Sequence, residues 1–331
     1  MGKKVSIIEV AKEAGVSKST VSRVLNDSYG VSKETREKVL KAARRLKYRT
    51  NVSARYLRSN SSNLLGILIS KDYSDEGIVH LVNSRKISGI VNKVSELGYD
   101  VLIFIEDIHD YKRLNEVIRE KGLSGIILLN DIPVDILESF RDYDLPFVLV
   151  NWYAKDYEHQ CFVKTDLAAA TRMGLDILTQ KGYKDIGVIN WEDGLRNENI
   201  IENEFINYMQ NKGLNWKDCV WNTEIDPGRE AVEKYIRSSG KRAYLSFSYI
   251  SSMYILDYCR KNGISIPGDI ALLSYEFFPF FDYLYPRLSG LRQQAELMGE
   301  KAVEKLIQML HGIENVKSEL IPPEIVLRDT C

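Results

Sequence analysis

Apolar residues recur at helical spacing in two short segments near the start of the chain, within residues 6–26. Ser6 with Glu9 three positions later forms a capping box, and Gly15 suits the left-handed turn that ends a helix. Ser17 can cap a second helix, whose apolar positions face the first. Two helices joined by a glycine turn, the second with a polar outer face, predict a helix-turn-helix.

The outer face of the second helix indicates a partner. Its side chains can all hydrogen-bond to phosphates or base edges: Lys18, Ser19, Ser22, Arg23 and Asn26. A helix-turn-helix places its second helix in the DNA major groove. An ordinary helical hairpin with a solvated face is the alternative. The coincidence of caps, turn glycine and polar face favours DNA binding.

A third helix and a polar linker follow. Ser32 can cap a helix that shares the small core of the first two, so we expect one DNA-binding domain over residues 1–48. Residues 49–62 are polar, and Asn51 can cap two turns of helix there. The free-energy cost of starting a helix exceeds the stabilisation from the few hydrogen bonds that two turns contain. We therefore expect this hinge helix to form only against a partner.

From residue 64 onward, short apolar runs alternate with segments of helical spacing. The runs predict strands at 64–69, 101–105, 125–129, 147–150, 186–189, 244–247 and 270–274. The segments between them predict helices at 78–97, 111–120, 167–181, 200–211, 228–238 and 251–262. Near-continuous apolar strands between helices are typical of parallel sheets covered on both faces. The strands are too many for one compact sheet, so the pattern predicts two doubly wound α/β subdomains.

A cleft between the two subdomains is the expected ligand site, because such sheets bind ligands at the carboxyl ends of their strands. Residues 63–331 are expected to form this effector-binding and dimerisation domain. We predict an N-terminal subdomain over about 63–158 plus 291–320. The C-terminal subdomain is predicted over about 159–290 plus 321–331.

Charge divides the chain in the same way. Residues 1–60 carry 15 lysines and arginines against 5 acidic residues, whereas the other 271 residues carry 30 against 41. A positive head on a negative body is expected of a nucleic-acid-binding module joined to a domain with another role. No apolar stretch predicts a signal peptide or a membrane span, so we expect a cytoplasmic protein that associates with the nucleoid when bound to DNA.

Neither a metal site nor a cofactor is predicted. The four cysteines and four histidines are scattered, without a CxxC pair, and the thiols are expected to be reduced. The chain lacks GxSxG, a Walker lysine motif, GxGxxG after a strand and HExxH, so no enzyme is expected. A secreted solute-binding protein would share the two-lobed body but has no use for the basic head.

The head resembles the lactose-repressor (LacI/GalR) family of bacterial transcription regulators. The motifs that carry this resemblance are EVAKEAGVSKSTVSRVLN at 9–26 and VSKETREKV at 31–39, with Tyr48, Asn51, Ala54, Arg55 and Leu57. Fainter matches continue through the body: GILI at 66–69, GIIL at 125–128, LPFVLV at 145–150, GYKDIGVI at 182–189, IPGDIA at 266–271 and a late helix at 299–310. The resemblance implies a body like that of periplasmic sugar-binding proteins.

The family implies a homodimer that reads a near-palindromic operator, usually as a repressor. Carried over by position, the recognition helix supplies Ser17, Lys18, Ser19, Ser22, Arg23 and Asn26. The resemblance also implies contacts to the DNA backbone from four further residues, Ser6, Ile8, Ser32 and Thr35. The hinge contributes Asn51, Ala54, Arg55 and Leu57, the leucine wedging open the central minor-groove step. Thr50 replaces the family's usual proline before the hinge, so we expect looser helix initiation.

The predicted effector pocket departs from the family. The arginine that commonly anchors the effector is absent from residues 201–205, while Asp166 and the acid at Glu276 are retained. Residues near predicted strand ends are the candidates for contacting an effector: Tyr73, Trp152, Asp166, Trp191, Arg196, Tyr249, Glu276 and Phe277. Aromatic rings with a few acids suit a sugar or sugar derivative, although each ring is equally compatible with a place in the core.

Several alternatives stay open at this point. The trigger could be a nucleobase-type corepressor or a protein partner rather than a sugar, and the effector could induce or corepress. In each case coupling is the difference in effector affinity between the DNA-bound and free states.

Overall fold

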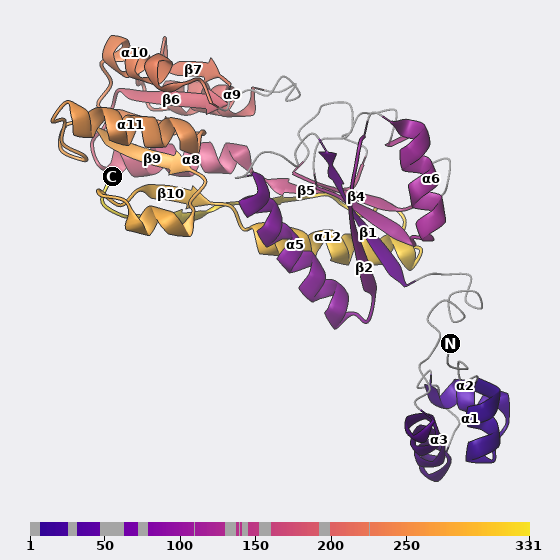
Figure 1. Cartoon of the computed structure of the whole chain (residues 1–331). Helices are drawn as coiled ribbons and strands as arrows, with labels where there is room; N and C mark the ends of the chain where they lie inside the picture. The colour runs from indigo at the N-terminus through magenta and orange to yellow at the C-terminus, as the bar shows by residue number, and fades with distance from the viewer. Residues whose placement is uncertain are drawn as a thin grey trace. The chain divides into compact units, whose positions relative to one another are not determined.

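The computed structural model describes residues 7–25, 32–46, 63–71, 79–108, 110–129, 137–138, 140, 145–151, 160–191, 199–224 and 226–331. The chain divides into two compact units, Met1–Ser62 and Asn63–Cys331 (Figure 1). They are called here the head and the body.

The described part of the head contains three helices, α1 (Ile7–Ala14), α2 (Lys18–Leu25) and α3 (Lys33–Arg45). They share a small core of valines and alanines: Val10, Ala11, Val21, Val24, Val39, Ala42 and Ala43. Gly15 has a φ of +66° between the first two helices, and the N–H of Val16 donates to the carbonyl of Ala11 at 3.1 Å. This left-handed turn ends α1 and confirms the predicted helix-turn-helix geometry.

The first sheet of the body has six parallel strands in the order β11-β5-β4-β3-β1-β2. Their bounds are β1 Leu64–Ser70, β2 Asp100–Glu106, β3 Gly125–Leu128, β4 Phe147–Val150, β5 Phe162–Thr165 and β11 Glu319–Ile321. Helices α5 (Val79–Glu96) and α12 (Ala295–Leu310) cover one face, and α6 (Tyr111–Lys121) covers the other. Apolar residues on both faces of the strands explain the near-continuous runs seen in the sequence.

The second sheet also has six strands, in the order β12-β10-β9-β8-β6-β7, and only the β10–β12 pair is antiparallel. Their bounds are β6 Ile186–Trp191, β7 Val220–Thr223, β8 Ala243–Ser246, β9 Ala271–Tyr275, β10 Ser289–Arg292 and β12 Glu324–Val326. One face is covered by α8 (Leu167–Gln180) and α9 (Ile200–Asn211). The other is covered by α10 (Arg229–Ser239) and α11 (Tyr249–Lys261), with a 3-10 turn, η3 (Pro279–Tyr283), packed beside them.

The predicted boundary between the subdomains near residue 159 is too early. Strand β5 follows that position yet pairs with β4 in the first sheet, where Leu149 lies opposite Phe162. The chain therefore crosses to the second sheet at Asp166. The pattern missed β5 because only four residues alternate there between buried and partly buried positions.

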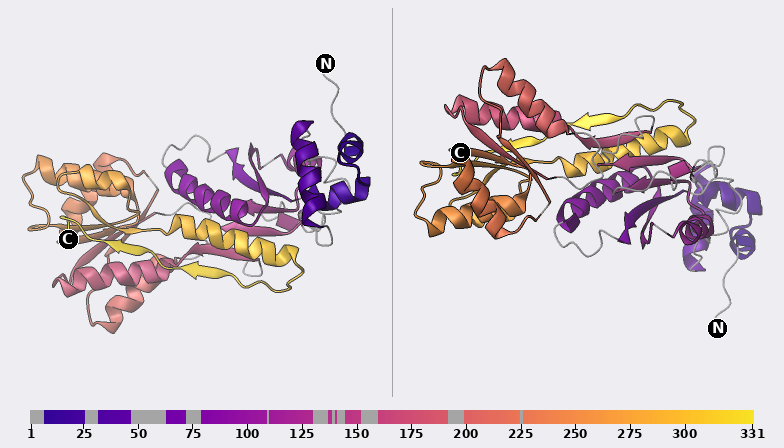
Figure 2. Two further views of the ribbon diagram at one scale, coloured as in Figure 1. Left: turned by 90° about the horizontal axis from the view of Figure 1, so that it is seen from below. Right: turned by 90° about the horizontal axis from the view of Figure 1, so that it is seen from above.

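The chain passes between the two sheets three times, after β5, after β10 and after β11. The crossing segments are bonded to one another, since the N–H of Asp166 donates to the carbonyl of Ile321 at 2.9 Å. The Nε2 of Gln294 donates to the carbonyl of Pro322 at 3.0 Å. Three bonded crossings give the two lobes a common hinge within the body, and Figure 2 shows α12 running back along the first sheet beside α5.

Candidate DNA-binding face and effector site

The second helix of the head begins with a serine cap. The Oγ of Ser17 accepts a hydrogen bond from the N–H of Thr20 at 3.1 Å and lies 2.7 Å from the Oγ of Ser19. Lys18 and Ser19 are exposed on the first turn. The cap fixes the start of α2 and leaves an ammonium and hydroxyl groups available to an external partner.

The third helix has the same kind of start. The Oγ of Ser32 accepts from the N–H of Thr35 at 3.2 Å, and the two hydroxyl oxygens are 2.8 Å apart. Ser32 is exposed, so its hydroxyl hydrogen and the N–H groups at the start of α3 can donate to an anion such as a DNA phosphate.

Several predicted residues lie outside the described part of the chain: Ser6, Asn26, Asn51, Ala54, Arg55, Leu57, Tyr73, Trp152 and Arg196. The backbones of Ile8, Ser22, Arg23 and Trp191 lie in α1, α2, α2 and β6, without a description of their side chains. Their proposed contacts stay predictions.

A polar network joins the two sheets at the carboxyl ends of their strands. Gln293, in the crossing between β10 and α12, accepts at its Oε1 from the Oγ1 of Thr165 at 3.0 Å and from the Nδ2 of Asn151 at 3.3 Å. Its Nε2 donates to the carboxylate of Glu276, which directly follows β9. We call Asn151, Thr165, Gln293 and Glu276 the interlobe network.

Backbone geometry marks two members of this network. Asn151 has a φ of +63° and Glu276 a φ of +75°, at the ends of β4 and β9. Left-handed backbone disfavours a glutamate more than an asparagine, and such residues cluster at ligand clamps and switch regions. Glu276 was predicted from the family pattern, whereas Gln293, Thr165 and Asn151 were missed. An amide or hydroxyl that ends an otherwise apolar strand was the signal available for Asn151 and Thr165.

Residues from four strands share one level at the carboxyl edge of the second sheet. Asn190 of β6 pairs with Asn222 of β7, while Ile189 lies opposite Ser246 and Ser246 opposite Ser274. One residue further along, Asn190, Phe247 and Tyr275 therefore stand side by side, and their side chains point to the face covered by α8 and α9. We call Asn222, Asn190, Phe247 and Tyr275 the edge row.

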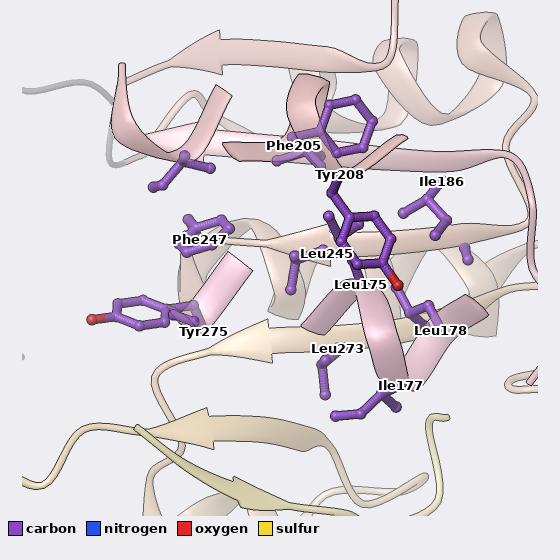
Figure 3. Close-up of a cluster of buried hydrophobic side chains, with 14 of the residues drawn as sticks. Leu175, Ile177, Leu178, Ile186, Phe205, Tyr208, Leu245, Phe247, Leu273 and Tyr275 are labelled. Carbon is purple, nitrogen blue, oxygen red and sulfur yellow. The ribbon is translucent and has the colours of Figure 1, made fainter. Parts of the chain in front are cut away.

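The aromatic members of the edge row form a stacked pair, with ring centroids 5.1 Å apart and an interplanar angle of 30°. Figure 3 shows Phe247 and Tyr275 at one end of the apolar cluster, with the Tyr275 hydroxyl directed away from the other labelled side chains. The pair thus closes the core of the second lobe where its strands end.

The structure corrects one predicted effector residue. Phe277 is only 5% exposed and packs edge-on against Phe281 at a centroid distance of 5.6 Å, so its ring belongs to the core. Neighbouring Phe278 is equally buried, and the half-buried Tyr249 contacts it edge-on at 5.5 Å. Asp166 has a structural role as the cap of α8, accepting from the N–H of Ala169 at 2.8 Å.

No group of three His, Cys, Asp or Glu side chains within the described residues could hold a metal ion. All four cysteines are free and buried, and burial raises the pKa of the Cys161 and Cys259 thiols to about 11 each. Within the same residues, no helix has the length and apolar character needed to cross a bilayer.

Two family models match the two units. Residues 6–51 match the model described as bacterial regulatory proteins, lacI family, and residues 175–331 match a periplasmic binding protein-like domain. The HTH-type transcriptional regulator RegA of Clostridium saccharobutylicum is 29% identical over 336 residues, covering 97% of this chain and 96% of that protein. The ribose operon repressor of Lactococcus lactis is 29% identical over 335 residues, covering 98% of this chain and 97% of that repressor.

Solved structures show the same fold. The lac repressor dimer bound to operator and the anti-inducer ONPF superimposes with a TM-score of 0.80 at 21% identity, over 99% of both chains. A complex of the transcriptional regulator CelR with cellobiose gives a TM-score of 0.71 at 20% identity, over 99% of this chain and 100% of that one. The predicted fold, a helix-turn-helix head on a two-lobed α/β body, is confirmed.

Proposed function

Because the chain belongs to the LacI family of bacterial regulatory proteins, we propose that it represses transcription from a near-palindromic operator under control of a small effector, a sugar or sugar derivative, bound in its body. The role is one of binding rather than catalysis, and it is exercised in the cytoplasm, where the operator DNA lies. The match of residues 6–51 to the lacI-family model is the main support, together with the capped α2 and its exposed Lys18.

The operator-reading residues are assigned on this basis. Lys18 and Ser19 contact base edges from the start of α2, and Ser22, Arg23 and Asn26 continue this face toward bases and phosphates. Ser17 and Ser32 combine capping with phosphate contact, and Ser6, Ile8 and Thr35 make further contacts to the DNA backbone. In the hinge, Asn51, Ala54 and Arg55 follow the minor groove.

Leu57 provides the direct test of operator binding. Wedging a leucine into a base step kinks the duplex at a cost of a few kcal/mol, which the contacts of the bent complex offset. Leu57→Ala should therefore weaken operator binding by at least tenfold in fluorescence anisotropy while the dimer stays intact in sedimentation. Leu327→Ala, an exposed leucine of the body, is the matched control. Unchanged operator affinity in Leu57→Ala would discard the wedge.

The effector site is placed at the carboxyl edges of the two sheets. Asp166 and Glu276 lie there as acceptors, Tyr249 starts α11 and Trp191 ends β6. Tyr73, Trp152 and Arg196 come shortly after strands β1, β4 and β6 in the sequence. The names of a ribose operon repressor and of a CelR–cellobiose complex among the similar proteins support a carbohydrate. Isothermal titration of the full chain against sugars, sugar phosphates and nucleobases tests this. Absence of any binding would remove the small-molecule effector.

The surfaces of the homodimer are assigned from exposed apolar side chains. Ile103 and Ile105 are 44% and 52% exposed on β2, which is the edge strand of the first sheet. Tyr283 and Tyr285 are 89% and 97% exposed beside η3 on the second lobe. Exposed edge-strand isoleucines and tyrosines are typical of interfaces, so a second copy of the chain is proposed to cover both.

A further inference from the structure

Three polar side chains form a hydrogen-bonded chain that ends in the edge row. The carboxylate of Glu202, in the first turn of α9, accepts from the Nδ2 of Asn222 at 2.9 Å. The Oδ1 of Asn222 in turn accepts from the Nδ2 of Asn190 at 2.9 Å. The same Nδ2 lies 3.5 Å from the Oδ1 of Asn199, the residue that directly precedes α9. We call Glu202, Asn222 and Asn190 the amide relay.

Glu202 fixes the direction of every bond in the relay. A carboxylate oxygen only accepts, so Asn222 must turn its amide nitrogen toward Glu202 and its oxygen toward Asn190. Asn190 must then turn its own nitrogen toward Asn222. The far end of the relay is therefore a carbonyl oxygen, and its identity as an acceptor follows from chemistry rather than from the choice between two amide orientations.

That terminal acceptor is buried and unsatisfied. Asn190 is 3% exposed, and its Oδ1 has no hydrogen-bond partner within the described part of the chain. Such an atom is costly, and more than nine in ten buried polar groups of proteins avoid this state. The two hydrogen bonds of the relay hold the Oδ1 of Asn190 in one orientation. A buried acceptor that is oriented but has no partner in the protein indicates a donor from a bound ligand.

The position of Asn190 indicates where that donor binds. Parallel strands lie about 4.8 Å apart, so Asn190 stands about 5 Å from Phe247 and about 10 Å from Tyr275 in the edge row. The acceptor thus lies beside the stacked aromatic pair, at the strand ends where α/β sheets bind ligands. Glu276 and Asp166, which add two carboxylates, follow strands at the carboxyl edges of the two sheets.

We propose that Asn190 is a specificity-determining residue of the effector site, whose Oδ1 accepts a hydrogen bond from a hydroxyl of a carbohydrate, and that Glu202 is the positioning residue that makes it an acceptor. The inference rests on the proposed function and names the effector class of that site. An acceptor-rich edge with aromatic rings suits a ligand that combines several O–H donors with apolar C–H faces.

The first experiment identifies the donor. The full-length chain is titrated calorimetrically with D-ribose, D-glucose, D-galactose, cellobiose, adenine and guanine, and the sugar that binds best is replaced by its monodeoxyfluoro analogues. Fluorine cannot donate, so one analogue should bind the unaltered protein at least tenfold more weakly than the parent sugar. In Asn190→Leu that difference between analogue and parent should disappear, because the acceptor is gone.

The second experiment tests the direction of the relay without changing the row. Glu202→Gln allows the amides to reverse, so the parent sugar should bind at least fivefold more weakly while the fluoro analogue loses little. Glu204→Gln is the matched control, since it removes the same charge from α9 but its carboxylate pairs with Arg172 at 2.9 Å, outside the relay. It should bind the sugar as the unaltered protein does.

The outcomes separate the inference from the proposed function. Absence of binding by every sugar overturns the carbohydrate effector and this inference with it, and binding of adenine or guanine alone does the same. Sugar binding that is equally sensitive to fluorination in the unaltered protein and in Asn190→Leu overturns the inference alone. If Asn190→Leu does not fold by circular dichroism, equal sugar affinities of Glu202→Gln and Glu204→Gln overturn it instead.

Discussion

Side-chain caps begin helices in both the head and the body. Ser17 and Ser32 cap α2 and α3 through their hydroxyl oxygens, and their positions at the starts of these helices also suit contact with DNA phosphates. In the body, Asp166 caps α8 at the edge where an effector is proposed to bind. A side-chain cap stabilises the start of any helix, so a capping serine or aspartate in a sequence does not by itself indicate contact with DNA or an effector.

An ion pair near the end of the chain should leave a signature in the pH dependence of stability. Arg287 donates to both oxygens of the Asp329 carboxylate, at 2.8 and 2.9 Å, and holds the pKa of that carboxyl at about 2, below its usual 3.8. A lowered pKa contributes stability that is fully present above pH 4 and is lost as the pH falls through about 2. Asp329→Asn should therefore lower the Tm at pH 7, and this effect should shrink as the pH falls toward 2.

The measurement is differential scanning fluorimetry from pH 7 to pH 2. Because the pair is about half exposed, the difference in Tm should be small. Glu314→Gln, on the exposed turn after α12, serves as the control and should follow the unaltered protein at every pH. A difference in Tm between Asp329→Asn and the unaltered protein that persists unchanged at pH 2 would contradict the assignment.

At the scale of elements, the crossing of α5 and α12 depends on two glycines that let the backbones touch. A Cβ on Gly299 would lie 2.2 Å from the carbonyl oxygen of Lys86, and one on Gly89 would lie 2.1 Å from that of Glu296. These atoms belong to helix backbone and cannot move alone. Overpacking of this kind typically costs about 1–3 kcal/mol.

Gly299→Ala should therefore reduce the free energy of unfolding by about 1–3 kcal/mol, despite the better helix propensity of alanine. Gln308→Ala on the exposed side of α12 should change it by less than about 0.5 kcal/mol. Urea unfolding followed by far-UV circular dichroism measures both. Equal stability of Gly299→Ala and the unaltered protein would mean that the helices separate without loss.

The edge strand β2 carries the prediction for assembly. Phe104 is buried, whereas its neighbours Ile103 and Ile105 are exposed, so an apolar surface faces outward at the edge of the sheet. Ile105→Lys places a charge there and should shift the dimer to monomer in sedimentation velocity. Lys71→Ile, beyond the end of β1, is the control for a change of charge and should stay dimeric. A dimer that persists in Ile105→Lys would exclude β2 from the interface.

At the scale of the body, the interlobe network is the physical link between the two sheets. Gln293 is 6% exposed and bonds to Thr165 and Asn151 from the first sheet and to Glu276 from the second. A change in the angle between the lobes would move Glu276 relative to Thr165 and Asn151, and would thereby alter the hydrogen bonds of Gln293. The network is thus placed to bias two arrangements of the lobes, as coupling between an effector and the operator requires.

Gln293→Leu should uncouple the two sites. The ratio of operator affinities with and without a bound sugar should fall toward one, and the Tm should drop because buried polar partners lose their bonds. Gln294→Leu removes a bond to the carbonyl of Pro322 in the neighbouring crossing and should retain most of the response. Anisotropy titrations of operator at saturating sugar measure the ratio. An unchanged ratio in Gln293→Leu would assign the network a purely structural role.

The sequence by itself determined the parts that depend on local order. Caps, a glycine turn and helical spacing within residues 6–46 specify the head, because each signal acts over three or four residues. The alternation of apolar runs and helices likewise specified a doubly wound α/β body. The charge division between head and body also needs no tertiary information.

Tertiary structure alone decided which distant residues meet. Asn190, Phe247 and Tyr275 are far apart in the chain and become neighbours only because β6, β8 and β9 pair in parallel at one register. Pairing with β4 placed β5 in the first sheet, and packing against Phe281 put Phe277 in the core rather than in the predicted site. Register and strand order come from hydrogen bonds between segments that local spacing does not encode.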